Sequence, residues 1–296
     1  ISHGYFNGRN PDNKIIDKCA SIHLRYAFEH SPSSRIGTLY PAVYQGIGIA
    51  SYTFFSERAV GTPLALYLFQ GARLHDSKGS GASVGYEWNL GYSWGWRPND
   101  AMNSRWNVLI NVGIPIGWQM EGGWELSLTP DFTHFSNGDT SYPNAGTNTF
   151  GLRIGALVEF GNRHHTKVDI RRLAEPSVEL GDNGTTGRLV WDLIAYGGWR
   201  ADRFFSNDRF CVVNRPLVNG GLMFSPLYRL NRYVSIGGSL DLFIDTSANL
   251  YDAVWQDDML VSYMRPPLWQ QTSLGVSLRG ELRMGYMAVG VGSGLN

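Results

Sequence analysis

Hydrophobic side chains recur at every second position over long stretches of this 296-residue chain. In residues 106–120 the even positions are Val108, Ile110, Val112, Ile114, Ile116, Trp118 and Met120. Most of the odd positions between them hold Asn, Gly, Pro or Gln. Side chains alternate between the two faces of a β-strand, so this pattern predicts strands with one apolar face and one small or polar face. Residues 82–96 and 272–284 show the same alternation.

The pattern predicts about twelve strands, separated by turn clusters such as RPND (97–100) and LGDNGTTG (180–187). They lie near residues 20–30, 45–55, 63–74, 82–96, 106–120, 124–137, 147–160, 187–204, 212–229, 233–248, 271–285 and 286–296. Strands in soluble domains are usually about five or six residues long, and these stretches are much longer. Two architectures are compatible with long alternating strands: a soluble β-sandwich and a membrane β-barrel.

Three features favour the membrane barrel. The second face of the strands carries Gly, Ser, Asn and oppositely charged Arg and Glu, as a barrel lumen does. Trp and Tyr gather towards strand ends, where an interfacial girdle would lie. A closed barrel also satisfies every backbone hydrogen bond in lipid. The mean hydropathy of −0.20 is compatible with such a barrel, because its strands alternate. No run of apolar residues is long enough for an ordinary transmembrane helix.

The predicted fold class is therefore all-β, a transmembrane antiparallel barrel of about twelve or more strands. We expect residues 1–296 to form this barrel as a single domain, with 187–296 contributing additional strands, and we expect the C-terminus to be truncated. The charges at Glu87, Arg153, Glu159, Arg279, Glu281 and Arg283 are interpreted as lumen groups that pair inside the barrel.

Charge and cysteine content exclude some classes of function. The chain has 25 Lys and Arg against 25 Asp and Glu, so its formal net charge is zero, which argues against a general nucleic-acid binder. Cys19 and Cys211 are interpreted as incidental, since two cysteines allow little inference. His164 and His165 are interpreted as part of a solvated turn, because no acidic or thiol partner is in register with them.

The segment WELSLTPDFTHFSNG (124–138) continues the alternation but ends it with polar residues. His134 and Ser136 lie on the lipid-facing side, at the end of their strand. The next strand places Asn148 on the same side, at its beginning. A hairpin symmetric about residues 142–143 sets Ser136 opposite Asn148, and a register shifted by two residues sets His134 opposite Asn148. Cross-strand and diagonal neighbours are close enough for side chains to touch, so three polar groups converge on one patch of the outer wall.

These three residue types can form a nucleophilic constellation. A serine needs a base to take its proton, and histidine is the usual one. The base needs a third group to fix its tautomer, and the side-chain carbonyl of Asn148 can supply it. The position predicts an acyl chain as substrate, with its tail in the lipid and its ester at the interface. The alternative interpretation is a rim of polar side chains at the membrane interface, which every barrel has.

The sequence His-x-Ser-Asn on the outer face of a barrel strand resembles the lipid A 3-O-deacylase family. The resemblance covers roughly residues 80–160 and includes the turn with Pro143, Asn144 and Gly146. Members of that family are small outer-membrane barrels with the active site on the outer wall. They hydrolyse an ester-linked acyl chain of lipid A with a Ser–His–Glu triad and without a metal or other cofactor.

The resemblance implies that Ser136 is the nucleophile and His134 the general base, with Asn137 helping at the oxyanion site and Gly138 and Asp139 supporting it. The glutamate of the family corresponds to Asn148 in this chain. A neutral Asn can orient an imidazole but cannot stabilise imidazolium by charge, and Asp139 is the alternative carboxylate. The family barrel is also roughly half as long as this chain, so it does not explain the strands beyond residue 187.

The resulting hypothesis is an outer-membrane serine esterase that removes an ester-linked acyl chain from lipid A or a related lipid. Its partners would be the acyl chains of lipopolysaccharide and outer-membrane lipid, with no nucleic acid, metal or cofactor, in a Gram-negative bacterium. The alternative is a non-enzymatic outer-membrane barrel, either a porin-like channel or a structural protein with a relic motif. Contact of His134 with Asn148 or Asp139 favours the enzyme, and divergence of His134 from Ser136 favours the relic.

Overall fold

The computed structural model describes residues 2–6, 16–31, 34, 37, 40, 42–76, 81–99, 101–160, 189–206, 208–231, 233–256, 259–284 and 287–295. Sixteen strands are present within them, together with two short helical turns, α2 (Glu57–Val60) and η1 (Leu268–Gln271). All strand pairing is antiparallel. The predicted all-β class is thus confirmed. Two compact units contain the strands, one with β1–β9 and the other with β10–β16.

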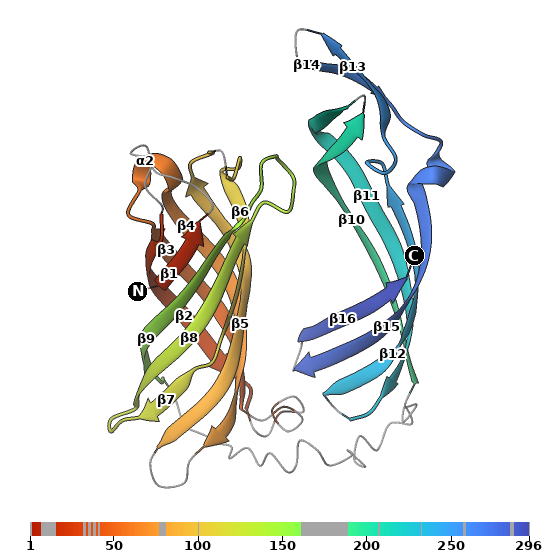
Figure 1. Cartoon of the computed structure of the whole chain (residues 1–296). Coiled ribbons are helices and arrows are strands. Elements are labelled where there is room, and N and C mark those ends of the chain that lie inside the picture. The colour runs from red at the N-terminus through yellow and green to blue at the C-terminus, as the bar shows by residue number, and fades with distance from the viewer. Residues whose placement is uncertain are drawn as a thin grey trace. The chain divides into compact units, whose positions relative to one another are not determined.

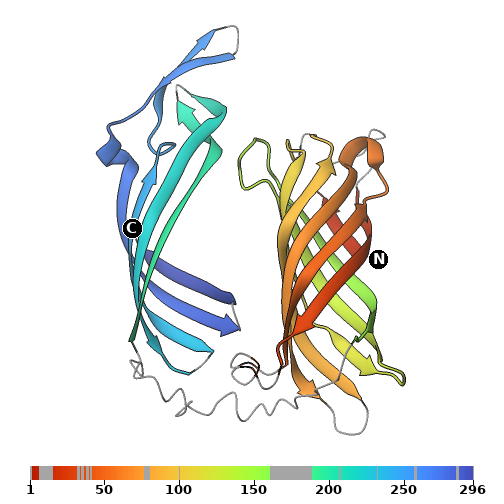
Figure 2. The ribbon, with the colours of Figure 1, turned by 180° about the vertical axis from the view of Figure 1, so that it is seen from behind.

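The strands of the first unit are β1 (Ser2–Phe6), β2 (Lys18–Glu29), β3 (Val43–Thr53), β4 (Gly61–Asp76), β5 (Ala82–Trp96), β6 (Trp106–Gly113), β7 (Ile116–Gln119), β8 (Trp124–Ser136) and β9 (Thr147–Val158). Apart from β6 and β7, neighbours in sequence pair with each other, and β1 pairs with both β2 and β9, which closes the barrel. Figures 1 and 2 give opposite views of this unit and show its strands curled around a common interior. We call this unit the N-terminal barrel.

The predicted strand at 106–120 is divided in two by a proline. Pro115 has no N–H to donate to a neighbouring strand, and pairing stops between β6 and β7. The backbone there still finds partners, because Ile114 N donates to Pro130 O at 3.0 Å and Gly85 N donates to Pro115 O at 2.9 Å. β6 and β7 therefore occupy one position between β5 and β8.

The interior of the N-terminal barrel is filled by side chains. Glu87 is only 3% exposed and binds Arg25 at 2.6 Å and Arg153 at 2.7 Å. Tyr67 and Phe69 are buried beside this cluster, and the Arg25 guanidinium lies 3.9 Å from the centre of the Phe69 ring. The predicted pairing of Glu87 and Arg153 inside the barrel is confirmed.

At one end of the barrel the interior is aromatic. Phe135 has no exposed surface, and its ring centre lies 5.1 Å from that of Tyr52 and 4.9 Å from that of Trp96. Phe54 joins the same cluster. Burial of these large rings supplies apolar packing to the end of β8.

The second unit contains β10 (Leu189–Ser206), β11 (Arg209–Arg229), β12 (Val234–Asp245), β15 (Thr272–Met284) and β16 (Met287–Leu295), paired in that order in one sheet. The hairpin β13 (Tyr251–Gln256) and β14 (Met259–Met264) is a separate pair. We call the five-stranded sheet the C-terminal sheet. Among the described strands, β10 and β16 each have a neighbour on one side only.

The C-terminal sheet also has two unlike faces. One face exposes large apolar side chains: Trp191, Leu193, Phe224, Leu240, Leu274, Val276 and Leu278. The other carries Arg279, which pairs with Asp192 at 2.9 Å and Glu281 at 3.6 Å, and Arg283, which pairs with Glu281 at 2.9 Å. The predicted pairing of these charges is confirmed, and their place in a barrel lumen stays a prediction. That residues 1–296 form a single barrel stays a prediction. The strand pairing among the described residues forms an N-terminal barrel and a C-terminal sheet.

All twelve predicted strands are present, with the division in 106–120 noted above. The pattern missed β1, β13 and β14. These are short, and the first of them contains SHGYF, where polar, small and aromatic residues do not alternate cleanly.

Candidate active site on the outer wall of the N-terminal barrel

The site lies where the hairpin of β8 and β9 reaches the end of the barrel. β8 ends at Ser136 and β9 begins at Thr147. Their register pairs His134 with Asn148, which is the shifted alternative of the two registers that the sequence allows. His134, Ser136 and Asn148 are half-buried, whereas the alternating residues Thr133, Phe135 and Thr147 are buried inside the barrel. The predicted outward side of the first three residues is confirmed.

His134 and Asn148 are hydrogen-bonded. His134 Nδ1 lies 2.7 Å from Asn148 Oδ1. A carbonyl oxygen only accepts, so Nδ1 must carry the proton, and in the neutral ring Nε2 then has a free lone pair. This is the tautomer that a general base needs for a serine hydroxyl.

Ser136 accepts two hydrogen bonds from the loop that follows it. Gly138 N donates to Ser136 Oγ at 3.1 Å, and Asn144 Nδ2 donates to it at 3.0 Å. No hydrogen bond joins Ser136 to His134 in this structure. Residues two apart on a strand are about 6.6 Å apart along it, so a rotation of the two side chains is needed to bring Nε2 to the hydroxyl. Catalytic hydrogen bonds are often loose in ligand-free enzymes and tighten with substrate.

Asn144 is held in place by a second loop. The loop 97–105 joins the loop 137–146 through Asn103 N to Pro143 O at 2.8 Å and Ala145 N to Ala101 O at 2.7 Å. Met102 and Asn144 form a β-bridge between these hydrogen bonds. The sequence placed Asn144 in the turn without giving it a role, because pairing between two loops has no period that can be read from residues.

The three predicted support residues, Asn137, Gly138 and Asp139, differ in their burial and in their contacts with the site. Asn137 is buried, and its backbone N–H donates to Asn144 Oδ1 at 3.2 Å, so it contacts the asparagine that contacts the serine. Gly138 has a φ of +65° and its N–H reaches Ser136 directly. Asp139 is exposed with a φ of +59°. The carbonyl that meets His134 comes from Asn148, in the position that the sequence assigned to it.

Gly146 is required by the position of the imidazole. Its φ is +69°, and a Cβ built on it would lie 3.0 Å from His134 Cε1 and 3.7 Å from His134 Nε2. The ring edge with Cε1 and Nε2 therefore lies over Gly146. Only glycine combines this backbone conformation with so close an approach at little cost.

An apolar wall surrounds the polar group. In the register of the sheet, Ile110 is beside His134, and Val108 is beside Ser136. In the next row, Phe132 and Phe150 are paired with ring centres 4.8 Å apart. Exposed aromatic and aliphatic side chains at this surface are those a lipid chain would contact.

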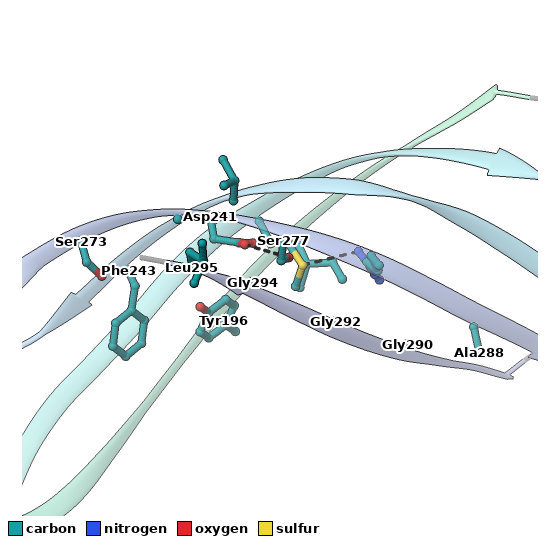
Figure 3. A pocket seen from close by; sticks show the side chains of 15 residues that line it. Tyr196, Asp241, Phe243, Ser273, Ser277, Ala288, Gly290, Gly292, Gly294 and Leu295 are labelled. Atoms are coloured by element: carbon teal, nitrogen blue, oxygen red, sulfur yellow. Dashed lines mark hydrogen bonds between the residues drawn. The ribbon is translucent and has the colours of Figure 1, made fainter.

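A hollow on the polar face of the C-terminal sheet contains another serine with a polar neighbour (Figure 3). It has a volume of about 590 Å³. Ser277 Oγ donates to Asp241 Oδ2 at 3.2 Å, and Ser239 Oγ donates to the same oxygen at 2.9 Å. Residues 189–296 contain no histidine, so Ser277 has no imidazole base in its own sheet.

A hydrogen-bonded serine–histidine pair lies on the inward side of β2 in the N-terminal barrel. His23 Nε2 lies 3.0 Å from Ser21 Oγ, and His23 Nδ1 lies 2.9 Å from the Tyr67 hydroxyl. Both residues belong to β2 on the side opposite to the exposed Ile22 and Leu24, so the pair does not lie on the apolar wall. Sequence reasoning missed it, although the spacing Ser-x-His was visible.

Two searches of the described residues gave negative results. They contain no group of three or more His, Cys, Asp or Glu side chains placed to hold a metal ion. In the same part of the chain, no helix is long and apolar enough to cross a membrane. His164 and His165 lie outside the described residues.

The fold and the outer-wall site define a β-barrel protein with a polar, hydrolase-like group on an apolar wall. Comparison with protein families agrees: the model of the lipid A 3-O-deacylase (PagL) family matches residues 4–156, which is more than half of the chain. The model of the acyloxyacyl hydrolase C-terminal domain (PagL_C) matches residues 189–296. The chain belongs to the lipid A 3-O-deacylase family, whose members are outer-membrane β-barrels. No curated protein and no solved structure gives a significant match.

The two matched ranges coincide with the two sheets. The first covers β1–β9 almost completely, and the second begins at the first residue of β10. The predicted resemblance covered residues 80–160 and is confirmed for the family. It underestimated the extent, because β10–β16 also match a domain model that is named for acyl-ester hydrolysis.

Proposed function

We propose that this protein is a serine esterase that removes an ester-linked acyl chain from lipid A or a closely related lipid in the outer membrane of a Gram-negative bacterium. The family supplies the reaction class, the deacylation of lipid A. The observation that carries the proposal is the 2.7 Å hydrogen bond from His134 to Asn148, on the lipid-facing wall beside Ser136. An interfacial rim of unrelated polar residues would not require the base to be oriented in this way.

In the proposed reaction Ser136 Oγ attacks the carbonyl carbon of the acyl ester while His134 Nε2 takes the hydroxyl proton. The C–O bond to the sugar breaks, and His134 returns the proton to the leaving alkoxide. Water then attacks the acyl-enzyme with His134 as base again, releasing a fatty acid and regenerating Ser136. The products are a carboxylic acid and an alcohol, and no external oxidant or cofactor is needed.

Two donors are available for the negative charge that develops on the carbonyl oxygen. Asn144 Nδ2 and Gly138 N now meet the Ser136 hydroxyl, so they lie next to the atom where the charge forms. Hydrogen bonds fixed in advance at such an oxygen are usually among the largest contributions to acyl transfer. Asn137, through its N–H bond to Asn144, acts as a positioning residue in this scheme.

The third group is the unusual part of the site. Asn148 orients the imidazole but carries no charge to stabilise imidazolium. In a Ser–His–Asp triad, replacing the acid by its amide costs on the order of ten thousandfold in rate, largely because the imidazole then adopts the wrong tautomer. Asn148 Oδ1 accepts from Nδ1 and keeps the correct tautomer, so the loss here should come from the missing charge alone and be smaller. We therefore expect a slow esterase, one whose orientation and oxyanion donors are intact.

The test is mass spectrometry of lipid A after incubation with the full chain in detergent micelles. Wild type and Ser277→Ala should each release one hydroxyacyl mass, and Ser136→Ala should release none. Ser277 is a suitable control because it also hydrogen-bonds to polar groups on a strand but has no histidine beside it. Cleavage that persists in Ser136→Ala would place the nucleophile elsewhere. No cleavage by folded wild type would leave the non-enzymatic barrel as the function.

A further inference from the structure

Arginines inside the N-terminal barrel are neutralised by carboxylates. Arg25 and Arg153 bind Glu87 at 2.6 and 2.7 Å, and Arg73 forms ion pairs with two glutamates. A buried guanidinium without a partner is strongly destabilising, so these pairs are required by the fold.

Three arginines at the end of the barrel that carries His134 and Ser136 are different. Arg58, Arg97 and Arg105 are exposed. None of the three forms an ion pair with a carboxylate within the described ranges. They lie in the loop between β3 and β4 and in the loop between β5 and β6.

The two loops are connected to each other and to the site. Arg97 Nη1 donates to the backbone oxygen of Arg58 at 3.3 Å, and Arg97 N donates to Val60 O at 2.8 Å. The loop that begins at Arg97 and ends at Arg105 is the one that pairs with Pro143 and Ala145 and so holds Asn144. The backbone of the loop 97–105 therefore holds Asn144, and the three arginine side chains project from the same connected loops.

Arg105 comes nearest to the serine along the sheet. Val108 is the register partner of Ser136 on the neighbouring strand, and Arg105 precedes Val108 by three residues, which corresponds to about 10 Å of strand. Between them is Trp106, which is 62% exposed and pairs with Trp94 at 5.8 Å between ring centres. Tryptophans of this kind mark the membrane interface, so Arg105 lies on the water side of it.

The loops at the two ends of the barrel carry unlike charges, whereas the start of β2, near the end with the site, has one charge of each sign, Asp17 and Lys18. On the loops 54–60, 97–105 and 137–146, the described carboxylates are Glu57 and Asp139, against the three arginines. At the opposite end, most of the charged residues that the structure describes are acidic, and Arg73 is the arginine described among them. These acidic residues are Glu29, Glu121, Glu125 and Glu159.

We propose that Arg58, Arg97 and Arg105 form an anion-binding rim for the phosphorylated head group of the lipid whose acyl ester is cleaved, a proposal that rests on the proposed function of Ser136. The apolar wall below Ser136 accommodates the acyl chains, so the head group of the same molecule extends past the serine towards the arginines. A guanidinium binds phosphate through paired charge-assisted hydrogen bonds. Within the described ranges, no carboxylate occupies the donors of these three side chains.

The test compares bis-phosphorylated and enzymatically dephosphorylated lipid A as substrates for the full chain in micelles. The triple variant Arg58→Gln, Arg97→Gln, Arg105→Gln should lower kcat/KM for the phosphorylated lipid by about tenfold to a hundredfold, mostly through KM. Its rate on the dephosphorylated lipid should equal that of wild type. Arg265→Gln, which removes an exposed arginine of the C-terminal half, is the matched control and should change neither rate.

Binding gives a second readout that does not depend on catalysis. Titration of Ser136→Ala with each lipid should show tighter binding of the phosphorylated one, and adding the three Arg→Gln changes should remove that preference. An equal loss on both lipids would show a structural role for the arginines and overturn the rim. An unchanged preference for the phosphorylated lipid would overturn it too. If wild type binds with this preference but does not cleave, the esterase proposal fails and the rim stands.

Discussion

The N-terminal barrel and the C-terminal sheet are built on the same alternation but differ in two ways. The barrel closes through β1, which pairs with both β2 and β9, whereas β10 and β16 are each paired on one side only among the described strands. The barrel has His134 at the end of an apolar strand face, whereas residues 189–296 have no histidine. Alternation therefore determines which side chains share a face, and does not by itself determine closure or chemistry.

Serines are polar and hydrogen-bonded in both units, so the difference lies in their neighbours. Ser277 and Ser239 donate to the carboxylate of Asp241, and residues 189–296 contain no imidazole to serve as their base. Ser136 meets two N–H donors, and an oriented imidazole lies on the same strand face. A nucleophile requires a base and donors for the oxyanion, and only the outer wall of the barrel brings these together in the described part of the chain.

Removing the imidazole of His134 should have the largest effect on the deacylation rate. It would leave the serines of both units without a histidine on their strand face. We expect His134→Ala to lower the rate of lipid A deacylation by roughly 10⁴- to 10⁶-fold, because residues of a triad act as a unit. The double variant with Ser136→Ala should be no slower than either single one. Single-turnover assays with radiolabelled lipid A measure this, and multiplicative losses would contradict the shared role. His23→Ala is the control for a histidine that lies inside the barrel.

Charge on the orienting group should have the next largest effect, with the opposite sign. Asn148→Glu should raise the rate by about 10- to 10²-fold, since a carboxylate keeps the same tautomer and adds a charge that stabilises the imidazolium of the transition state. Asn148→Ala should lower it, because the Nδ1 proton loses its acceptor. The same single-turnover assay decides. A slower Asn148→Glu enzyme would show that the asparagine is adapted to a reaction other than serine acylation.

The fold was largely predictable because membrane strands are long and strictly alternating. Twelve strands, their faces and the pairing of Glu87 with arginine followed from period and charge alone. Closure did not, because β1 is short and its partners lie far away in sequence. The outward position of His134, Ser136 and Asn148 followed from parity. The role of Asn144 depends on a contact between two irregular loops, and such contacts have no signature in a single sequence.

The ion pairs allow a comparison of the interior of the N-terminal barrel with the polar face of the C-terminal sheet. Glu87→Ala should destabilise the barrel by about 3 kcal/mol, because the half-buried Arg25 loses its ion pair and Arg153 keeps only Asp131, at 3.9 Å. Glu281→Ala in the C-terminal sheet should cost only about 1 kcal/mol, since Arg279 keeps Asp192 at 2.9 Å. Urea unfolding in detergent, followed by tryptophan fluorescence, measures both. Equal losses would mean that the interior of the barrel is as well hydrated as the face of the open sheet.

The smallest expected effect concerns the glycine below the imidazole. Gly146→Ala forces a side chain into a φ of +69° and places a Cβ 3.0 Å from His134 Cε1. We expect a loss of about 1–2 kcal/mol in stability from the backbone alone. A Cβ at this distance also displaces the ring by a few tenths of an ångström, which should slow deacylation by about tenfold.

Gly280→Ala is its counterpart in β15, where a Cβ would meet nothing within 4 Å, and it should leave both unfolding and rate nearly unchanged. If Gly146→Ala loses stability but keeps its full rate, the imidazole does not depend on the loop for its position. The contrast between the two units would then come from the histidine itself, with the surrounding loop needed only to present Asn144 and Gly138 to the serine.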